Sequence, residues 1–136
     1  MIVDTSALVA TVYSEPGTEG IFRALRDGSG VIPAPVIIEL HRVTSLDGNQ
    51  PHPDTHGLLD VLERAGYRIA EFDRTMARLS VEANIRYGSG NGKGGKLNLL
   101  DLMVYAAAKA LDMPILCTGY DFMSTDAKIH PASRIG

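Results

Sequence analysis

The chain has 136 residues, a formal net charge of −3 and an isoelectric point near 5.7. This length is typical of one domain, which we expect over residues 1–136, and a hydrophobic content of 45% is enough for a buried core. The weak negative charge excludes a generally basic nucleic-acid-binding protein, and the single cysteine excludes an internal disulfide bond. Residues 1–13 lack the basic start of a signal peptide, and no apolar run reaches membrane-spanning length, so we expect a cytoplasmic protein.

The N-terminal part of the chain predicts short strands that alternate with helices. A buried strand over residues 1–3 runs directly into a helix over residues 5–13. Residues 17–27 continue with apolar side chains at helical spacing and end at a Gly-Ser-Gly sequence. A second short strand over residues 31–32 precedes a mostly apolar helix over residues 36–46.

The rest of the chain repeats this alternation. The expected elements, in order, are a loop over 47–54, a helix over 56–65, a strand over 67–72, a helix over 74–87 capped by Asp73, a glycine-rich loop over 88–95, a helix over 98–111 and a strand over 114–117. Strands separated by helices predict an α/β fold with a mostly parallel sheet.

Two acids in the first third of the chain do not lie on an ordinary solvated face. Asp4 follows a buried strand, and the carboxyl ends of parallel strands are where such sheets bind ligands. Asp4 could also cap the helix that follows. Glu39 lies on a helix with little polar surface, where the alternative is an ion pair with Arg42 one turn away.

Further acids of this kind come late in the chain. Asp101 is surrounded by leucine, methionine and valine, although a capping box with Asn98 would explain its position without any chemistry. Asp121 and Asp126 follow the last predicted strand, where either could be a turn or cap residue.

These acids form a pattern when they are taken together. Two follow strand ends and two lie on apolar helices, in a fold that gathers strand ends at one edge. Several carboxylates packed together repel one another, and a hard divalent cation such as Mg²⁺ or Mn²⁺ removes that repulsion. Such a site can activate water for phosphodiester hydrolysis.

Three stretches of the sequence resemble a known family. They are "MIVDTSAL" at the N-terminus, "RYGSGNGKGGKLNLLDLMVYAAAKAL" and "PILCTGYDFMSTD". Together with Glu39 they resemble the PIN-domain ribonucleases, and among these the VapC toxins of bacterial toxin–antitoxin pairs. The resemblance covers essentially the whole chain. It implies a three-layer α/β/α fold with a small, mostly parallel central sheet and an endoribonuclease that depends on Mg²⁺ or Mn²⁺. It also implies an RNA substrate, a small antitoxin partner and a homodimer.

The resemblance assigns roles to individual positions. Asp4, Glu39 and Asp101 match the acids of the family, which are catalytic and bind the metal. The Ser6 hydroxyl matches a group that orients the first acid. Polar residues at Thr118 and Asn98 match positions that support the same site.

One departure from the family concerns the fourth acid. The family often has "GDDF" where this chain has "GYDF", so Tyr120 replaces an acid. Asp121 is then the nearest fourth carboxylate for catalysis and metal binding, with Asp126 behind it. Tyr120 keeps an alternative open, namely a degenerate PIN-like domain that binds RNA or a protein without cleavage.

Basic residues that could hold the RNA backbone are few. They are Arg42 beside Glu39 and, in the acid-free stretch around the glycine loop, Arg86, Lys93 and Lys96. An ordinary solvated loop is the alternative for the second group.

Overall fold

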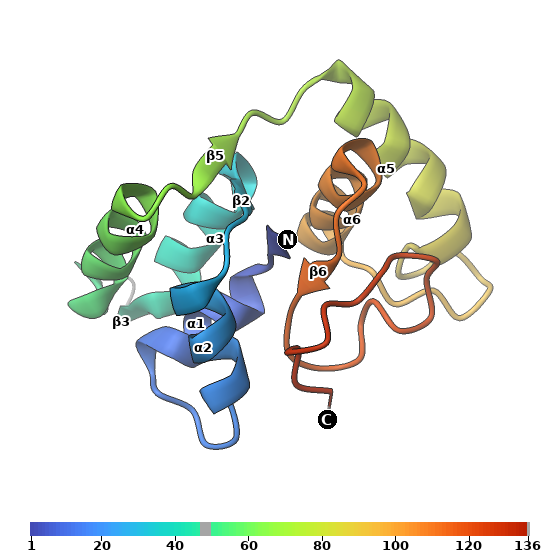
Figure 1. Cartoon of the computed structure of the whole chain (residues 1–136). Coiled ribbons are helices and arrows are strands. Elements are labelled where there is room, and N and C mark those ends of the chain that lie inside the picture. The colour runs from blue at the N-terminus through green and yellow to red at the C-terminus, as the bar shows by residue number, and fades with distance from the viewer. Residues whose placement is uncertain (47–49, 136) are drawn as a thin grey trace.

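The computed structural model describes residues 1–46 and 50–135 (Figure 1). Its centre is a four-stranded parallel sheet in the order β5-β2-β1-β6. The strands are β1 (Ile2–Val3), β2 (Val31–Pro33), β5 (Arg68–Ala70) and β6 (Ile115–Leu116). This sheet confirms the expected α/β class.

In the described residues, six helices flank the sheet. They are α1 (Thr5–Val12), α2 (Glu19–Asp27), α3 (Ala34–Thr44), α4 (Asp54–Arg64), α5 (Arg74–Tyr87) and α6 (Leu99–Leu111). Helix α1 contacts α2, α3 and α4, whereas α5 packs mainly on α6 (Figure 1). The crossovers β1–β2 and β2–β5 advance in one direction and the β5–β6 connection returns, so right-handed connections place the two groups on opposite faces. The expected three layers are therefore present.

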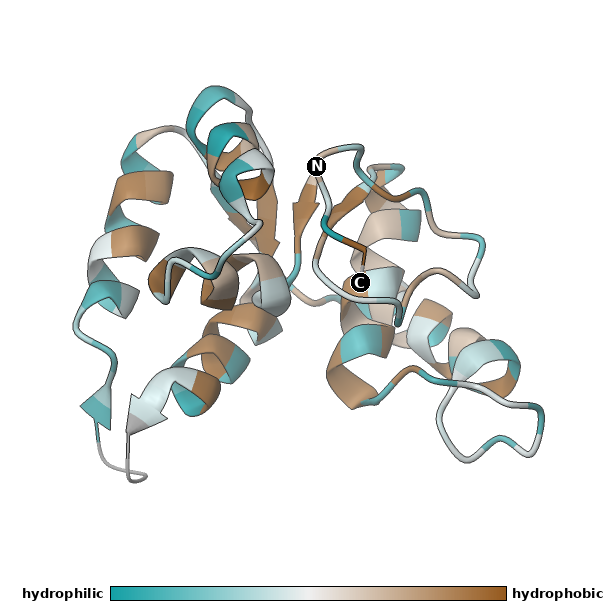
Figure 2. Cartoon of the chain, turned by 90° about the horizontal axis from the view of Figure 1, so that it is seen from below, coloured by the Kyte–Doolittle hydropathy of each residue, from teal (hydrophilic) through white to brown (hydrophobic). Residues whose placement is uncertain are grey.

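Strands β1 and β6 lie entirely inside the protein. Ile2, Val3, Ile115 and Leu116 have no exposed surface. Figure 2 colours the central strands as hydrophobic, with the helices on either side. Strands of a parallel sheet that is covered on both faces have continuous apolar sequences, which is the pattern at both positions.

The region after α3 differs from the expectation. Ser45 and Leu46 form β3 (Ser45–Leu46), not the end of a helix, and pair antiparallel with β4 (Gln50–Pro51). The His52 backbone N–H donates to the Thr44 carbonyl at 2.7 Å, which extends this pairing beyond the strands. The predicted loop over 47–54 is therefore wrong at residues 50–51 and at Asp54, where α4 begins, while residues 47–49 lie outside the described residues.

None of the helices in the described ranges is long and apolar enough to cross a membrane.

Candidate active site

Four acids that are far apart in the sequence line one pocket. Asp4 follows β1, Glu39 lies on α3, Asp101 is in the first turn of α6, and Asp121 lies in the turn after β6. The pocket has a volume of about 290 Å³, and Ser6 and Thr118 also line it. We call it the acidic pocket. It lies at the carboxyl ends of β1 and β6, where an open parallel sheet binds its ligands.

A chain of hydrogen bonds fixes the Asp4 side chain. Its Oδ2 accepts from the Ser6 backbone N–H at 3.0 Å and from the Ser6 hydroxyl at 2.5 Å. The Ser6 Oγ in turn accepts from the Thr118 backbone N–H at 3.0 Å. Asp4 is thus the N-cap of α1 as well as a pocket residue, and the backbone of Thr118 holds the hydroxyl that orients it.

Asp101 also combines a helix cap with the pocket. Its Oδ2 accepts from the Asn98 backbone N–H at 3.0 Å, and its own backbone N–H donates to Asn98 Oδ1 at 2.9 Å. The capping box that the sequence predicts is therefore present. Asn98 itself lines a different hollow, between α5 and α6, so it supports the site only by holding the first turn of α6.

The carboxylates repel one another. Burial raises the pKa of Asp4, which is 7% exposed; the Ser6 hydrogen bonds partly offset this increase, and the charge of Glu39 adds to it. Burial also raises the pKa of Asp101 to about 7, and the charges of Asp4, Asp121 and Glu39 contribute. Across residues 1–46 and 50–135, none of the four has an ion pair with a basic side chain.

This donor set suits a hard divalent cation. Carboxylate oxygens are the ligands that Mg²⁺ and Mn²⁺ prefer. In the described residues, the four carboxylates have no basic side chain to balance their charge. Thr5 adds a buried hydroxyl at the pocket that has no hydrogen-bond partner among the described residues. Within those residues no three acidic, histidine or cysteine side chains are already gathered closely enough to hold an ion. The arrangement therefore fits a hydrated ion, because Mg²⁺ usually keeps several waters and takes only one or two protein carboxylates.

The turn after β6 separates Asp121 from its neighbours. Asp121 lines the acidic pocket, whereas Tyr120 is 61% exposed and does not. Asp126 lies outside the pocket, because it accepts a hydrogen bond from the Tyr105 hydroxyl and pairs with Lys109 at 3.2 Å. Asp121 therefore lies in the same pocket as Asp4, Glu39 and Asp101, and Asp126 anchors the loop to α6.

Sequence reasoning missed a fifth carboxylate, that of Glu15. It lines the acidic pocket, but unlike the other four it has a basic partner, Arg134, whose Nη2 lies 3.3 Å from Glu15 Oε2. Nothing in the sequence near Glu15 indicates this position. Its partner lies at the other end of the chain, and only the folded structure brings the two together.

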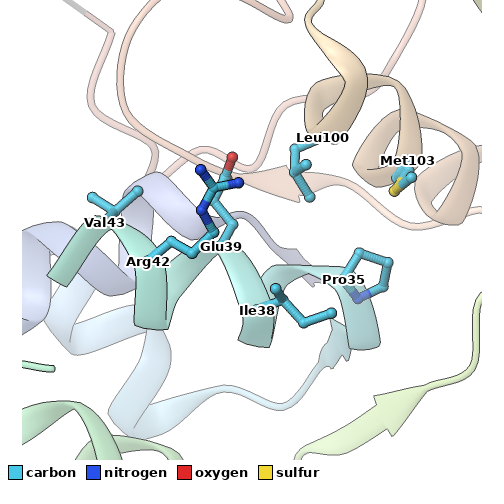
Figure 3. Close-up of a pocket in the computed structure, with 7 residues that line it drawn as sticks. All are labelled: Pro35, Ile38, Glu39, Arg42, Val43, Leu100 and Met103. Carbon is cyan, nitrogen blue, oxygen red and sulfur yellow. The ribbon is translucent and has the colours of Figure 1, made fainter. Parts of the chain in front are cut away.

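The basic residues divide into two groups. Arg42 lines a larger hollow of about 550 Å³ between α3 and α6, which shares Glu39 with the acidic pocket. Figure 3 shows Glu39 and Arg42 on α3, with Leu100 and Met103 opposite on α6. No Glu39–Arg42 ion pair forms within the described residues.

The second group lies outside both hollows. Arg86 stacks over the Tyr87 ring at 4.7 Å and lies 4.0 Å from Asp126. Lys93, in the glycine loop, and Lys96, directly after it, are exposed. A role for these three in binding the substrate therefore requires RNA that extends beyond the pocket.

Comparison with known proteins points to one family. The model of the PIN domain matches residues 1–128. Ribonuclease VapC42 of Mycobacterium tuberculosis is 37% identical over 134 residues, which is 97% of this chain and 98% of the relative. Two solved structures share the fold. M. tuberculosis VapC20, described as a sarcin-ricin loop cleaving toxin, superposes with a TM-score of 0.72 at 13% identity, and the match covers 93% of this chain and 95% of that one. A toxin–antitoxin complex from Klebsiella pneumoniae gives a TM-score of 0.65 at 18% identity, and the match covers 96% of each chain.

Proposed function

The chain belongs to the PIN-domain family, and from this premise we propose that it is an endoribonuclease, the toxin of a toxin–antitoxin pair. Relatives named VapC ribonucleases, which match nearly the whole chain, support an enzyme that hydrolyses RNA phosphodiester bonds. Ribonucleases of this family generally depend on a divalent metal ion, and Mg²⁺ or Mn²⁺ is the ion that we propose here. The activity belongs in the cytoplasm, where the RNA is, and residues 1–136 act as one domain.

The observation that carries this proposal is the acidic pocket. Asp4, Glu39, Asp101 and Asp121 come from four different elements and line one pocket without a basic partner in the described residues. We assign them the role of metal ligands, direct or through water. A bound ion would neutralise the phosphate and lower the pKa of a bound water.

The chain's own residues prepare the site for this chemistry. Ser6 and the backbone of Thr118 hold Asp4 in one orientation, and the capping box holds Asp101. Val9 and Phe122 line the pocket beside the acids and form its apolar part. A carboxylate that the ion leaves free can accept the proton of the attacking water.

Solved toxin–antitoxin complexes with this fold support the partners. They include the Klebsiella pneumoniae complex and a FitAB structure, described as bound to a DNA fragment. For this chain we propose a cognate antitoxin and a homodimer. The weak negative charge does not favour DNA as the direct ligand of this chain.

A domain that binds RNA without cutting it is the second possibility. One observation favours it, the tyrosine at position 120. Against it, Asp121 lines the pocket next to the other acids. Calorimetric titration with Mn²⁺ separates the two, because a non-cleaving scaffold has no need to bind the ion.

The proposal is tested by RNA cleavage with purified protein in Mg²⁺, in Mn²⁺ and in EDTA. We expect cleavage only with a metal, and a loss of at least about 100-fold in Asp4→Asn and in Glu39→Gln. Glu82→Gln, at an exposed position of α5 outside the acidic pocket, is the matched control and should cut normally. Cleavage in EDTA, or undiminished cleavage by both pocket variants, would contradict the proposal.

A further inference from the structure

A second hollow adjoins the acidic pocket on the side of α1 and α2. It has a volume of about 510 Å³, and Glu15 lines both. Its other walls come from the end of α1, the turn over residues 13–18 and one face of α2. We call it the Phe22 hollow, after its one aromatic residue. Nothing in the proposed chemistry so far uses it.

The wall between the two hollows is fixed in place. Arg134 Nη1 donates to the Pro16 carbonyl at 2.8 Å, and Nη2 holds Glu15. The backbone of Arg134 is bonded to Cys117 and Gly119, on either side of the pocket residue Thr118. A single residue thus ties the turn to the edge of the acidic pocket, and the two hollows keep their relative positions.

The lining of the Phe22 hollow combines one aromatic residue with polar and charged residues. All of its lining residues except Ala10 and Phe22 are polar or charged, and yet the Phe22 ring is 54% exposed. Arg26 is bound by Asp27 at 2.7 Å, but Arg23 has no ion pair within residues 1–46 and 50–135. The hollow therefore offers one aromatic face and one available guanidinium, next to hydroxyl groups and two carboxylates, of which Glu15 is paired with Arg134 and Glu19 lies on the first turn of α2.

This combination matches a nucleotide better than it matches a peptide. Single-stranded RNA is bound by stacking its bases on aromatic rings and by pairing its phosphates with arginine. An amphipathic helix of a partner protein would need a continuous apolar groove, which this lining does not supply.

We propose that the Phe22 hollow binds the nucleotide next to the cleaved bond, with its base stacked on Phe22 and its phosphate paired with Arg23. The inference rests on the proposed function, since it takes RNA as the substrate of the acidic pocket. It adds a subsite outside the four acids, which makes Phe22 and Arg23 determinants of RNA binding and not of metal binding.

The absence of tryptophan in the chain allows a direct test. Phe22→Trp keeps a stacking surface and introduces a single fluorescent side chain. A short single-stranded RNA oligonucleotide, titrated in EDTA so that no cleavage occurs, should quench this tryptophan saturably, and less so at high salt. Val61→Trp, on α4 and likewise exposed, is the matched control and should not respond. Arg23→Gln, combined with Phe22→Trp, should weaken the binding several-fold.

Cleavage supplies the second readout. Phe22→Ala should raise KM about tenfold with little change in kcat and none in Mn²⁺ affinity, because a stacking contact is lost and the metal site is not. Phe22→Trp should restore KM. An unquenched tryptophan at RNA concentrations that bind the protein by another method, or an unchanged KM in Phe22→Ala, would overturn the proposal; quenching by a partner protein but not by RNA would do the same. Since the fluorescence test needs no cleavage, its failure is separable from a failure of the proposed function.

Discussion

Asp4 and Asp101 each carry two roles that the sequence presents as alternatives. Each side chain accepts a hydrogen bond at the start of a helix, and each lines the acidic pocket. A helix cap uses the carboxylate oxygens on the side of the backbone N–H groups, which leaves lone pairs directed away from the helix. Capping and a pocket position are therefore compatible. Local sequence patterns could not distinguish the two roles, because each role requires an acid at the same position of the sequence.

Asp101→Asn separates the two roles of this side chain. Asparagine is nearly the same shape and can keep the hydrogen bond from the Asn98 N–H, so the fold should survive. The negative charge is lost, and we expect RNA cleavage to fall by at least about 100-fold. Asp112→Asn, at the other end of α6, is the control and should cut normally, because Asp112 lies outside the acidic pocket and pairs with Lys128. Cleavage by Asp101→Asn at the wild-type rate would leave Asp101 as a cap alone.

The raised pKa of Asp101 predicts a pH dependence of stability. Its folded pKa of about 7 lies above the unfolded value, so the folded state binds this proton more tightly. The stabilisation is fully present below about pH 4 and is lost as the pH rises through 7. In EDTA, the unfolding free energy of Asp101→Asn minus that of the wild type should therefore increase from pH 5 to pH 8. We expect an increase of roughly 1 kcal/mol, after allowance for the solvent that reaches the pocket. Urea unfolding at the two pH values measures this difference, and a constant difference would contradict it.

Substitutions at the neighbouring residues Tyr120 and Asp121 should affect the metal requirement of cleavage differently. Asp121→Asn removes a pocket charge and should raise the metal concentration needed for half-maximal cleavage about tenfold or more. Tyr120→Asp restores the acid that the family often has, but at an exposed position away from the pocket, so it should change little. Cleavage measured against Mn²⁺ concentration distinguishes them. An unaffected Asp121→Asn together with a lower metal requirement in Tyr120→Asp would place the fourth acid at position 120.

At the scale of elements, sequence patterns predicted the helix ends that neighbouring residues determine. Helix α5 begins after the Asp73 cap and ends at Tyr87, as expected, because both ends are marked by nearby residues. The β3–β4 pair was missed, because Ser45, Gln50 and Pro51 do not form the buried apolar run that identified the equally short β1 and β6. The Glu15–Arg134 pair was missed for a different reason, since it joins residues 119 positions apart.

Ser6 links two elements, and its removal tests that link. The Ser6 hydroxyl joins Asp4, at the end of β1, to the backbone of Thr118, just beyond β6. Ser6→Ala leaves the Thr118 N–H without its partner, which should cost about 1–2 kcal/mol of unfolding free energy. It also frees the Asp4 side chain, so Mn²⁺ affinity should fall by about tenfold as measured by calorimetry. Ser80→Ala, where the hydroxyl bonds α5 and α6 backbone carbonyls, should lose stability only. Equal Mn²⁺ affinity in the two variants would mean that Ser6 does not orient Asp4.

For the whole molecule, the topology explains why acids at positions 4, 39, 101 and 121 meet. The parallel order β5-β2-β1-β6 brings the ends of β1 and β6 side by side, although more than 100 residues separate them. The rule for strand ends predicted from sequence that Asp4 and Asp121 lie near each other, whereas Glu39 and Asp101 lie on α3 and α6 and were expected there from their apolar surroundings. The directions of the side chains and the Phe22 hollow could not be predicted from this rule, because they depend on the packing of α2 and the C-terminal segment.

The same topology makes the acidic pocket a point of strain for the whole fold when no metal is bound. Its four carboxylates come from elements that must pack together, so their repulsion opposes folding, and a bound cation should relieve it. At a Mn²⁺ concentration of about 100 times Kd, linkage predicts about 2.7 kcal/mol of added stability, which corresponds to a rise in Tm of roughly 5–10 °C for a chain of this size. Differential scanning fluorimetry in Mn²⁺, compared with NaCl of equal ionic strength, measures the rise. Asp101→Asn should lose most of it and Asp112→Asn none, so an equal rise in both variants would show that the ion binds outside the pocket.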